Sequence, residues 1–334
     1  MKTAMKTVAL FNNKGGVGKT SLVYHLSWMF AELGKKVLAV DLDPQSNLTS
    51  MFLEEQAMEV LWDTDNANGN TVFHIVNPIL RGIGDISNPS PSKISSNLFL
   101  VPGHLGLSRF EDKLSAAWPD CHNRDEAAFR IMTAFYRLML AASGNDTDIV
   151  LIDVGPNLGA INRSALIASD TMCLPIAPDL FSLQGLANLG PALREWRATW
   201  KELKDKAPAN LDIPSGAMCP LGYILMQHSI RDSTVKAYQR WMDKVPRSYR
   251  ETVGDEIMSN PDDLPSVETD PCNLALLKHY RSLMPLAMEA RKPMFLLKSA
   301  DGAIGAHLES VRKCYEDFKK LAERIAYELQ LTLN

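Results

Sequence analysis

Short, almost continuously apolar runs alternate along the chain with longer segments whose apolar residues recur at helical spacing. The apolar runs lie at 7–11, 36–41, 98–102, 149–153, 171–176, 222–226 and 294–297. Helical spacing is clear in 22–33, directly after the first run. Buried strands that alternate with helices are typical of a parallel sheet with helices on both faces. We therefore predict a doubly wound α/β fold whose strands are mostly parallel.

Two polar, turn-rich regions interrupt this alternation, near 54–96 and near 246–272. Strands and helices resume after each region, so we interpret both as surface insertions and not as linkers between domains. The length of 334 residues suits one large α/β domain. We expect residues 1–334 to form that single domain.

The composition is that of a globular protein, with 46% apolar and 22% charged residues. A net charge of −4 argues against nucleic-acid binding through overall charge, so any such binding needs a local basic patch. The five cysteines include no C-x-x-C pair, which disfavours a zinc site or a disulfide framework. The sequence contains no apolar stretch of membrane-spanning length and no signal-peptide core. We expect a cytoplasmic protein that does not bind membranes.

A glycine-rich stretch joins the first predicted strand to the first predicted helix, and it reads Asn13-Lys14-Gly15-Gly16-Val17-Gly18-Lys19-Thr20. Glycines allow successive backbone N–H groups to point into one concavity, and a helix N-terminus adds partial positive charge there. Lys19 can reach β- and γ-phosphate oxygens, and the Thr20 hydroxyl can bind Mg²⁺. The residues predicted to bind a nucleoside triphosphate are Lys14, Gly15, Gly16, Val17, Gly18, Lys19, Thr20 and Ser21.

Two other predicted strands end in carboxylates. Asp41 and Asp43 end the second strand, and Asp153 ends the strand at 149–153. Ligands of open α/β sheets bind at the carboxyl ends of strands, so these side chains are candidates for the nucleotide site. The alternative for Asp41 and Asp43 is a structural role as strand-end caps. Asp153 follows an apolar run, as does the Walker B aspartate that holds Mg²⁺.

The phosphate loop departs from the common G-x-x-x-x-G-K-[ST] form, because Asn13 replaces the first glycine and Lys14 is an additional lysine. The form KGGVGKT resembles the deviant Walker A loop of the ParA/MinD family of ATPases, and in particular of Soj-like ParA partition ATPases. In that family the additional lysine crosses a dimer interface to the partner's nucleotide. The resemblance therefore implies ATP and Mg²⁺ as cofactors and a homodimer that forms on ATP binding, with Lys14 acting in trans.

Other segments resemble the same family in order along roughly two-thirds of the chain. The segment 41–49 is similar to its D-x-D-P-Q switch I, which implies that Asp43 orients the attacking water and that Asp41 lies near the Mg²⁺ shell. The family usually has D-x-P-P in switch II, but Gly155 replaces the first proline here and loosens that backbone. The implied catalytic residues are Lys14, Lys19 and Asp43, and the implied Mg²⁺ ligands are Thr20, Asp43 and Asp153.

Basic residues recur at helical spacing in two later segments. The first set is Arg194, Arg197, Lys201 and Lys204, and the second is Lys236, Arg240 and Lys244, followed by Arg247 and Arg250. Family members bind nonspecific DNA through basic patches of the ATP dimer, so both sets are candidate phosphate contacts; the alternative is a solvated helix face. The amphipathic segment 308–329 corresponds in place to the membrane-targeting helix of MinD-type relatives. Its mixed charges instead favour packing against the sheet.

The leading hypothesis is a ParA-like ATPase that dimerises on ATP binding, binds nonspecific DNA and a ParB-like or other adaptor protein, and resets by slow hydrolysis that the partner stimulates. Such a cycle serves the partitioning of DNA or other cargo, and DNA binding would place the protein on the nucleoid. The alternative, motivated by the two insertions, is an ATP-gated regulatory or signalling module that recruits an effector without segregating DNA.

Overall fold

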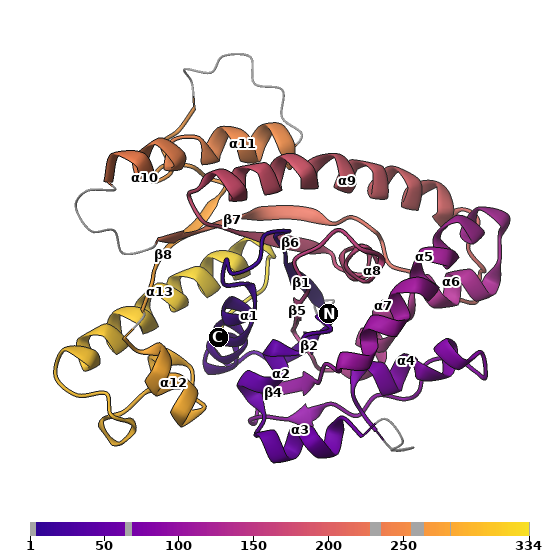
Figure 1. Cartoon of the computed structure of the whole chain (residues 1–334), viewed down its shortest axis with the longest axis horizontal. Helices are drawn as coiled ribbons and strands as arrows, with labels where there is room; N and C mark the ends of the chain where they lie inside the picture. The colour runs from indigo at the N-terminus through magenta and orange to yellow at the C-terminus, as the bar shows by residue number, and fades with distance from the viewer. Residues whose placement is uncertain (1–4, 64–68, 228–234, 255–263, 281, 334) are drawn as a thin grey trace.

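Eight strands form one sheet in the order β3-β4-β2-β5-β1-β6-β7-β8 (Figure 1). The computed structural model describes residues 5–63, 69–227, 235–254, 264–280 and 282–333. The strands are β1 Lys6–Leu10, β2 Val37–Asp41, β3 Ser92–Lys93, β4 Leu98–Val101, β5 Ile149–Asp153, β6 Thr171–Ile176, β7 Cys219–Gln227 and β8 Asn273–Lys278. The short β3 pairs antiparallel with β4, and the other pairs of neighbours are parallel. The predicted α/β class with a mostly parallel sheet is confirmed.

Helices cover both faces of this sheet. They are α1 Lys19–Glu32, α2 Asn47–Phe52, α3 Glu55–Leu61, α4 Val72–Arg81, α5 Phe110–Asp120, α6 Glu126–Met132, α7 Ala134–Ser143, α8 Ala160–Ile167, α9 Leu180–Lys204, α10 Val235–Met242, α11 Val245–Thr252, α12 Met284–Ala290 and α13 Ala306–Glu328. Short 3₁₀ helices are η1 Leu105–Arg109, η2 Cys121–Asn123, η4 Met294–Leu296 and η5 Ser299–Asp301.

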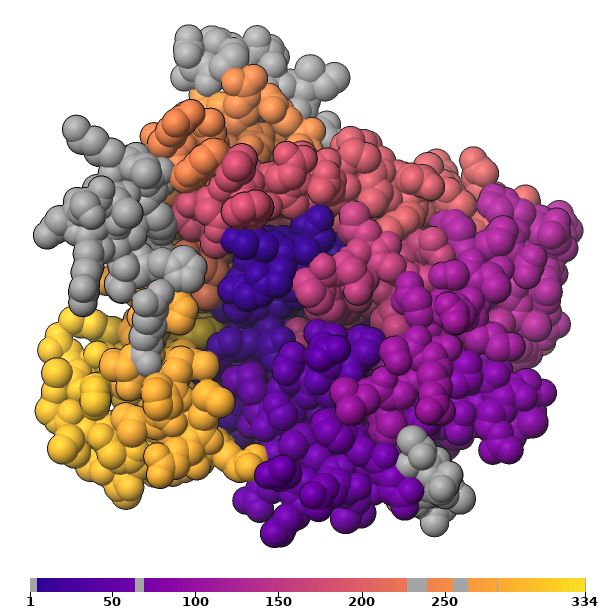
Figure 2. Space-filling model, viewed as in Figure 1, coloured from indigo at the N-terminus to yellow at the C-terminus, as the bar shows by residue number. Residues whose placement is uncertain are grey.

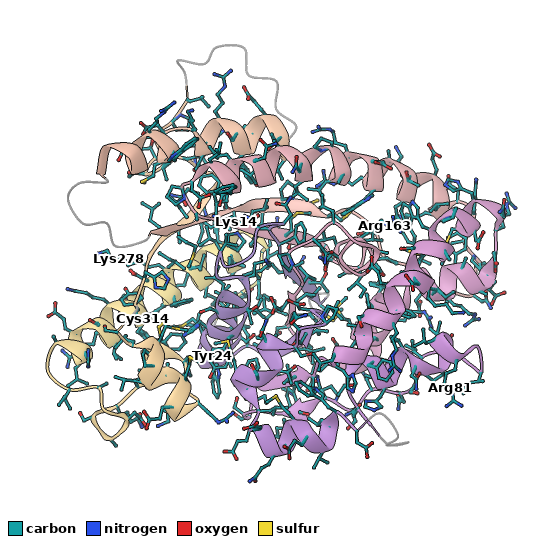
Figure 3. The ribbon with its side chains drawn as sticks, viewed as in Figure 1. Lys14, Tyr24, Arg81, Arg163, Lys278 and Cys314 are labelled. Atoms are coloured by element: carbon teal, nitrogen blue, oxygen red, sulfur yellow. The ribbon has the colours of Figure 1, made fainter. Side chains whose placement is uncertain are left out.

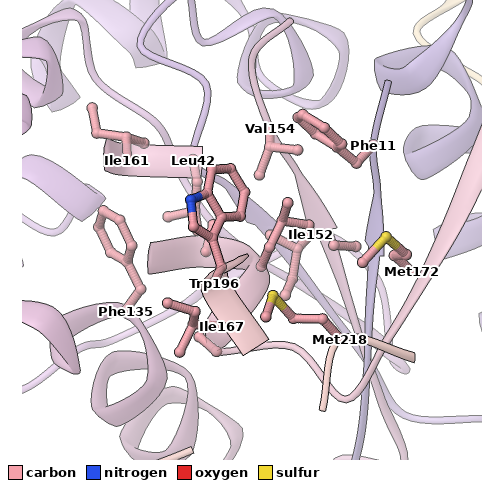
Figure 4. Close-up of a cluster of buried hydrophobic side chains, with 14 of the residues drawn as sticks. Phe11, Leu42, Phe135, Ile152, Val154, Ile161, Ile167, Met172, Trp196 and Met218 are labelled. Atoms are coloured by element: carbon pink, nitrogen blue, oxygen red, sulfur yellow. The ribbon is translucent and has the colours of Figure 1, made fainter. Parts of the chain in front are cut away.

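Alternate residues of each buried strand belong to two separate hydrophobic clusters, because successive side chains point to opposite faces. Val8 and Leu10 pack with buried residues of α1 and α13. Ala9 and Phe11 pack with residues of α5 to α9 and α11, and Figure 4 shows this second cluster around Trp196. Strands that are apolar on both faces are thus explained by a helical layer on each side.

Six of the seven predicted strands are confirmed, and the strand predicted at 294–297 is wrong. That segment contains the 3₁₀ helix η4, with Met294 and Phe295 buried in the same cluster as α13. A short buried apolar run has the same sequence pattern in a strand and in a helix, so apolar residues alone led to the wrong assignment. The sequence reasoning also missed β8 and the two-residue β3.

Both turn-rich regions contribute buried residues. In the first, α4 buries Val72 and Val76 in the cluster that also contains Phe11. In the second, Arg250 of α11 makes a buried ion pair with Asp270 just before β8. These regions are therefore anchored to the body of the protein. One domain with insertions near 54–96 and 246–272 stays a prediction.

The C-terminal helix α13 packs against α1, β8 and η4. Val311, Cys314 and Phe318 are among its buried residues, which confirms the predicted packing of this amphipathic segment. Within the described ranges, every helix is too short or too polar to cross a lipid bilayer.

Candidate nucleotide site

The glycine-rich loop connects β1 to α1 and has the backbone that its sequence predicts. Gly16 and Gly18 have φ values of 73° and 85°, in the left-handed region where glycine is strongly favoured. Gly18 is the N-cap of α1 and provides no side chain to bind the first N–H groups of the helix. The first turn of α1 also contains no acidic residue. These N–H groups are therefore available to an anion at the helix N-terminus.

Lys19 is the first residue of α1, directly after this loop, and is only 7% exposed. Its ammonium donates a hydrogen bond to the Lys14 carbonyl at 3.2 Å. Burial lowers the pKa of Lys19, whereas the charges of Asp153 and Asp43 raise it. The lysine is thus held close to the N–H groups of the loop and to two carboxylates.

Asp41 and Asp153 are brought together by the pairing of β2 with β5, in which they are partners in register. Asp41 accepts hydrogen bonds from the Thr49 N–H at 2.8 Å and the Thr49 hydroxyl at 2.6 Å. Burial raises the pKa of Asp41 to about 7, although both of these hydrogen bonds lower it. Since Asp41 is occupied by Thr49, it fixes the start of α2 beside the site.

Asp153 is fully buried, and neither of its oxygens has a hydrogen-bond partner among the described residues. Burial raises its pKa, the charge of Asp41 raises it further, and the nearby Thr20 hydroxyl lowers it without meeting hydrogen-bond geometry. An unpartnered buried carboxylate is unfavourable unless a cation compensates it. Asp153 and Thr20 therefore fit a cation site.

Mg²⁺ fits this donor set better than a metal enclosed by protein alone. Within the part of the chain that the structure describes, no group of three or more His, Cys, Asp or Glu side chains could hold a metal ion. Mg²⁺ commonly binds through one or two carboxylates together with substrate phosphates and water. Asp153, Thr20 and Asp43 are consistent with that pattern.

Asp43 follows β2 and lies beside the loop that follows β5. Its Oδ1 atom accepts a hydrogen bond from the Gln45 N–H at 3.0 Å. A β-carbon built on Gly155 would lie 3.4 Å from the same Oδ1, so the backbone after β5 passes directly beside this carboxylate.

A cavity of about 600 Å³ opens beside the loop, a size typical of small-molecule sites. Of the predicted loop residues, Gly15, Gly16, Gly18, Lys19, Thr20 and Ser21 line it, together with Asp43. Lys14, Val17 and Asp153 do not line it. In Figure 2, the N-terminal segment that contains the loop reaches the surface in the middle of the visible face.

The far end of the cavity is apolar and methionine-rich. Its lining includes Met226, Met284, Met288, Met294 and Phe318. Sequence reasoning missed Lys278, His279 and Tyr280, which also line the cavity. Lys278 is the last residue of β8 and the other two follow it, so recognition of that strand would have placed all three at this edge of the sheet.

Lys14 lies beside the N-terminus of α9 (Figure 3). Its ammonium forms an ion pair with Asp179, whose other oxygen accepts the Ser182 N–H at 2.9 Å and so caps α9. The ammonium also lies 5.9 Å from the centre of the Phe181 ring. The chain therefore provides Lys14 with an acidic and an aromatic neighbour of its own.

The basic residues of α9 mostly hold neighbouring loops. Arg194 donates to the Thr252 carbonyl, Arg197 to the Ala217 and Met218 carbonyls, and Lys204 to the Ser215 carbonyl. Lys201 is exposed.

In the second basic set, the candidate role of Arg250 as a phosphate contact is wrong, because its guanidinium is buried against Asp270. Arg247 pairs with Glu251 at 2.7 Å. Arg240 and Lys244 are exposed and lie 5.7 and 4.9 Å from the centre of the Trp241 ring. The side chain of Lys236 lies outside the described residues.

Parts of the sequence are similar to a protein-family model and to individual known proteins. A family model described as an AAA domain matches residues 5–205. The chain is 31% identical over 184 residues to the sporulation initiation inhibitor protein Soj of Bacillus subtilis, covering 55% of this chain and 63% of the relative. It is 29% identical over 205 residues to a probable plasmid-partitioning protein ParA of Thermus thermophilus, covering 61% and 54%. The matches thus span less than two thirds of these relatives.

Solved structures share the fold over nearly the whole chain. A protein from Corynebacterium diphtheriae has a TM-score of 0.66 at 24% identity, covering 97% of this chain and 99% of that one. The pNOB8 ParA has a TM-score of 0.63 at 17% identity, covering 98% and 99%. A putative plasmid partition protein of Borrelia burgdorferi, bound to AMPPNP, has a TM-score of 0.58 at 18% identity, covering 97% and 99%.

Proposed function

Since this chain belongs to the ParA/MinD family of P-loop ATPases and is of the ParA partition type, we propose that it is an ATP-driven switch that dimerises on ATP binding and serves the partitioning of DNA or other cargo. The observation that carries the proposal is the placement of Lys19 in a phosphate loop beside Asp43 and Asp153. Among the structural relatives, the Borrelia protein is bound to AMPPNP and a Cyanothece McdA variant is in complex with ATP, which supports ATP as the nucleotide.

Hydrolysis at this site depends on positioning and electrostatics. The N–H groups of the loop and the Lys19 ammonium bind the β- and γ-phosphates. Asp43 orients a water whose oxygen bonds to the γ-phosphorus as the bond to the ADP oxygen breaks. Its hydrogen bond from the Gln45 N–H and its burial fix the carboxylate for that role. Mg²⁺, held by Thr20, Asp43 and Asp153, would neutralise phosphate charge when bound.

Lys14 acts in trans in this proposal, on the nucleotide of a second copy. Its position outside the cavity of its own chain is consistent with that role. Leu180 and Phe181 are exposed beside its partner Asp179, and Phe181 is 73% exposed. An exposed apolar pair next to a catalytic lysine suits a surface that a second copy covers.

Molecular size in the presence of ATP and Mg²⁺ tests the dimer. We expect the wild type to dimerise, Lys14→Ala to stay monomeric, and Asp43→Ala to form a long-lived dimer that binds but does not hydrolyse ATP. If all three proteins remain monomers, the dimer mechanism is wrong and only nucleotide binding is left.

DNA binding through the second basic set is the second part of the proposal, and its exposed candidate contacts are Arg240 on α10 and Lys244 between α10 and α11. Charge reversal at Lys236, Arg240 and Lys244 should abolish salt-sensitive DNA retention by the ATP-bound protein. Lys113→Glu is the control, since it reverses an exposed charge on α5, outside both basic sets. Unchanged retention in the triple variant would exclude this basic set as the contact.

The remaining parts of the cycle concern hydrolysis rate, partner and location. We propose slow basal hydrolysis that a ParB-like or other adaptor stimulates, in a cytoplasmic protein that associates with the nucleoid through DNA. A steady-state ATPase assay with and without DNA and a candidate adaptor tests this. Fast ATP turnover by the protein alone would contradict the proposed slow basal hydrolysis.

A further inference from the structure

The loop between β5 and α8, residues 154–159, is held by a side chain that no motif had indicated. Asn162 of α8 is 1% exposed, and its Nδ2 donates to the Gly155 carbonyl at 2.9 Å. The same Nδ2 lies 2.7 Å from the Asn157 carbonyl oxygen and 3.0 Å from the Asn157 side-chain oxygen, so its two hydrogens are shared among three acceptors. Because all three neighbours are oxygens, only the amide nitrogen can face them.

The first turn of α8, the helix that carries Asn162, is held by the neighbouring helix α5. Glu111 of α5 accepts the Ala160 N–H at 2.5 Å and the Ile161 N–H at 2.8 Å, which are the first N–H groups of α8. A charged acceptor at a helix N-terminus is favourable and orders the first turn. Asn162 therefore extends from a helical turn whose position is fixed by α5.

The hydrogen bond from Asn162 to Gly155 bears on the proposed catalysis because Asp43 lies beside Gly155. Asp43, the proposed water-orienting residue, is the nearest neighbour that a β-carbon on Gly155 would meet. Glycine at this position leaves the backbone freer than the proline of the D-x-P-P form. A hydrogen bond to the Gly155 carbonyl restores part of that restraint.

We propose that Asn162 is a positioning residue for ATP hydrolysis: it holds the Gly155 peptide against Asp43 and replaces the restraint that a proline ring would give. The inference rests on the proposed ATPase function. Asn162 acts through the backbone of the loop and does not touch the nucleotide cavity. Its loss should therefore change turnover much more than nucleotide binding.

Three variants test this role. Asn162→Ala removes the contact, and Ser164→Ala is the matched control, because Ser164 is a buried residue of α8 whose hydroxyl donates to the Met132 carbonyl away from the loop. We expect Asn162→Ala to lower kcat by about ten- to a hundred-fold, as small misplacements do, with nucleotide Kd changed by less than about three-fold. Ser164→Ala should keep kcat within about three-fold of the wild type.

The double variant Gly155→Pro/Asn162→Ala separates positioning from simple loss of structure. Gly155 does not have a left-handed φ, and the nearest contact of a β-carbon built on it is an ordinary 3.4 Å, so neither the sign of φ nor the space at Cβ excludes proline. Proline restricts φ without the Asn162 contact, and we expect it to restore most of the lost kcat. Failure of this rescue, or an equal loss of kcat in Ser164→Ala, would overturn the proposal.

Hydrogen exchange of the amides in 154–160 gives a readout independent of turnover. Exchange should be faster in Asn162→Ala than in Ser164→Ala, and equal rates would refute the restraint. If the wild type shows no ATPase activity, the proposed function fails while this exchange difference still decides whether Asn162 restrains the loop.

Discussion

Lys14 and Asp179 form an ion pair within one chain, although they are 165 residues apart in the sequence. Burial raises the pKa of Asp179, but the Lys14 and Ser182 hydrogen bonds outweigh it and leave the pKa below its ordinary value. Asp179 is therefore charged at neutral pH. For Lys14 to reach the nucleotide of a second copy, as we propose, this pair must open.

The first prediction is that Asp179→Asn strengthens ATP-dependent dimerisation. Asparagine keeps the N-cap of α9 but removes the charge that holds Lys14. The pair is partly exposed, and such pairs are worth about 0–1 kcal/mol, so the dimer Kd should fall by about two- to five-fold for each pair broken. Sedimentation of the ATP-bound protein over a concentration series measures this. Weaker dimerisation with an intact α9 would show that Asp179 assists Lys14.

The second prediction concerns His25, which lies between the phosphate-loop helix and η4. Its ring contacts the Ser21 carbonyl through Nδ1 and accepts the Met294 N–H through Nε2. Burial lowers its pKa from 6.5 to about 4. The unfolded chain therefore binds a proton below pH 6.5 that the folded protein binds only near pH 4, so stability falls as pH drops through this window.

The contribution of His25 to that loss is roughly 3 kcal/mol at most, from about 1.36 kcal/mol per pKa unit. Urea unfolding of the wild type and His25→Gln between about pH 7 and pH 4 isolates it, because other titrating groups are common to both. The difference in unfolding free energy between the two proteins should narrow as pH falls. A constant difference would mean that His25 does not titrate in this way.

Local patterns were enough to predict the glycine loop, the strand-end carboxylates and the class of the sheet. They could not show that β2 pairs with β5, which is what brings Asp41 to Asp153. That neighbourhood depends on strand order, and strand order is a global property. The role of Asn162 was missed for a related reason, because an asparagine inside a helical pattern has no local signature.

The third prediction is that Asp270→Asn destabilises the protein by about 3 kcal/mol or more, since it leaves Arg250 buried without its counter-charge. Arg250 and the Tyr223 hydroxyl both donate to Asp270, the latter at 2.7 Å. Burial would raise the pKa of Asp270, but these donors lower it below 3.8. The stabilisation is thus present above pH 3.8 and is lost as pH falls toward the folded-state value.

The exposed pair Arg247–Glu251 on the same helix is the matched control. Glu251→Gln should cost less than about 0.5 kcal/mol, as is usual for exposed i,i+4 pairs. Denaturant unfolding at neutral pH compares the two variants. Equal effects would show that the pair with Asp270 is not buried in solution.

The fourth prediction contrasts the same substitution at two residues that are partners in register. Asp41→Asn, measured at about pH 8 and so above the Asp41 pKa of about 7, weakens the acceptor for both Thr49 donors and should cost about 1–2 kcal/mol in the nucleotide-free protein. Asp153→Asn replaces a buried carboxyl group whose oxygens have no hydrogen-bond partner among the described residues, so nucleotide-free stability should be unchanged or higher.

In the nucleotide-bound proteins, the substitution at Asp153 should have the larger effect on stability and the one at Asp41 the smaller. ATP with Mg²⁺ should raise the Tm of the wild type more than ATP with EDTA, because a ligand that binds only the folded state stabilises it by mass action. Asp153→Asn should lose the Mg²⁺-dependent part of this shift, whereas Asp41→Asn should keep most of it, since Thr49 already occupies Asp41. Thermal unfolding of the three proteins under the two conditions decides this. A full Mg²⁺-dependent shift in Asp153→Asn would mean that the unpartnered carboxylate is not compensated by the metal.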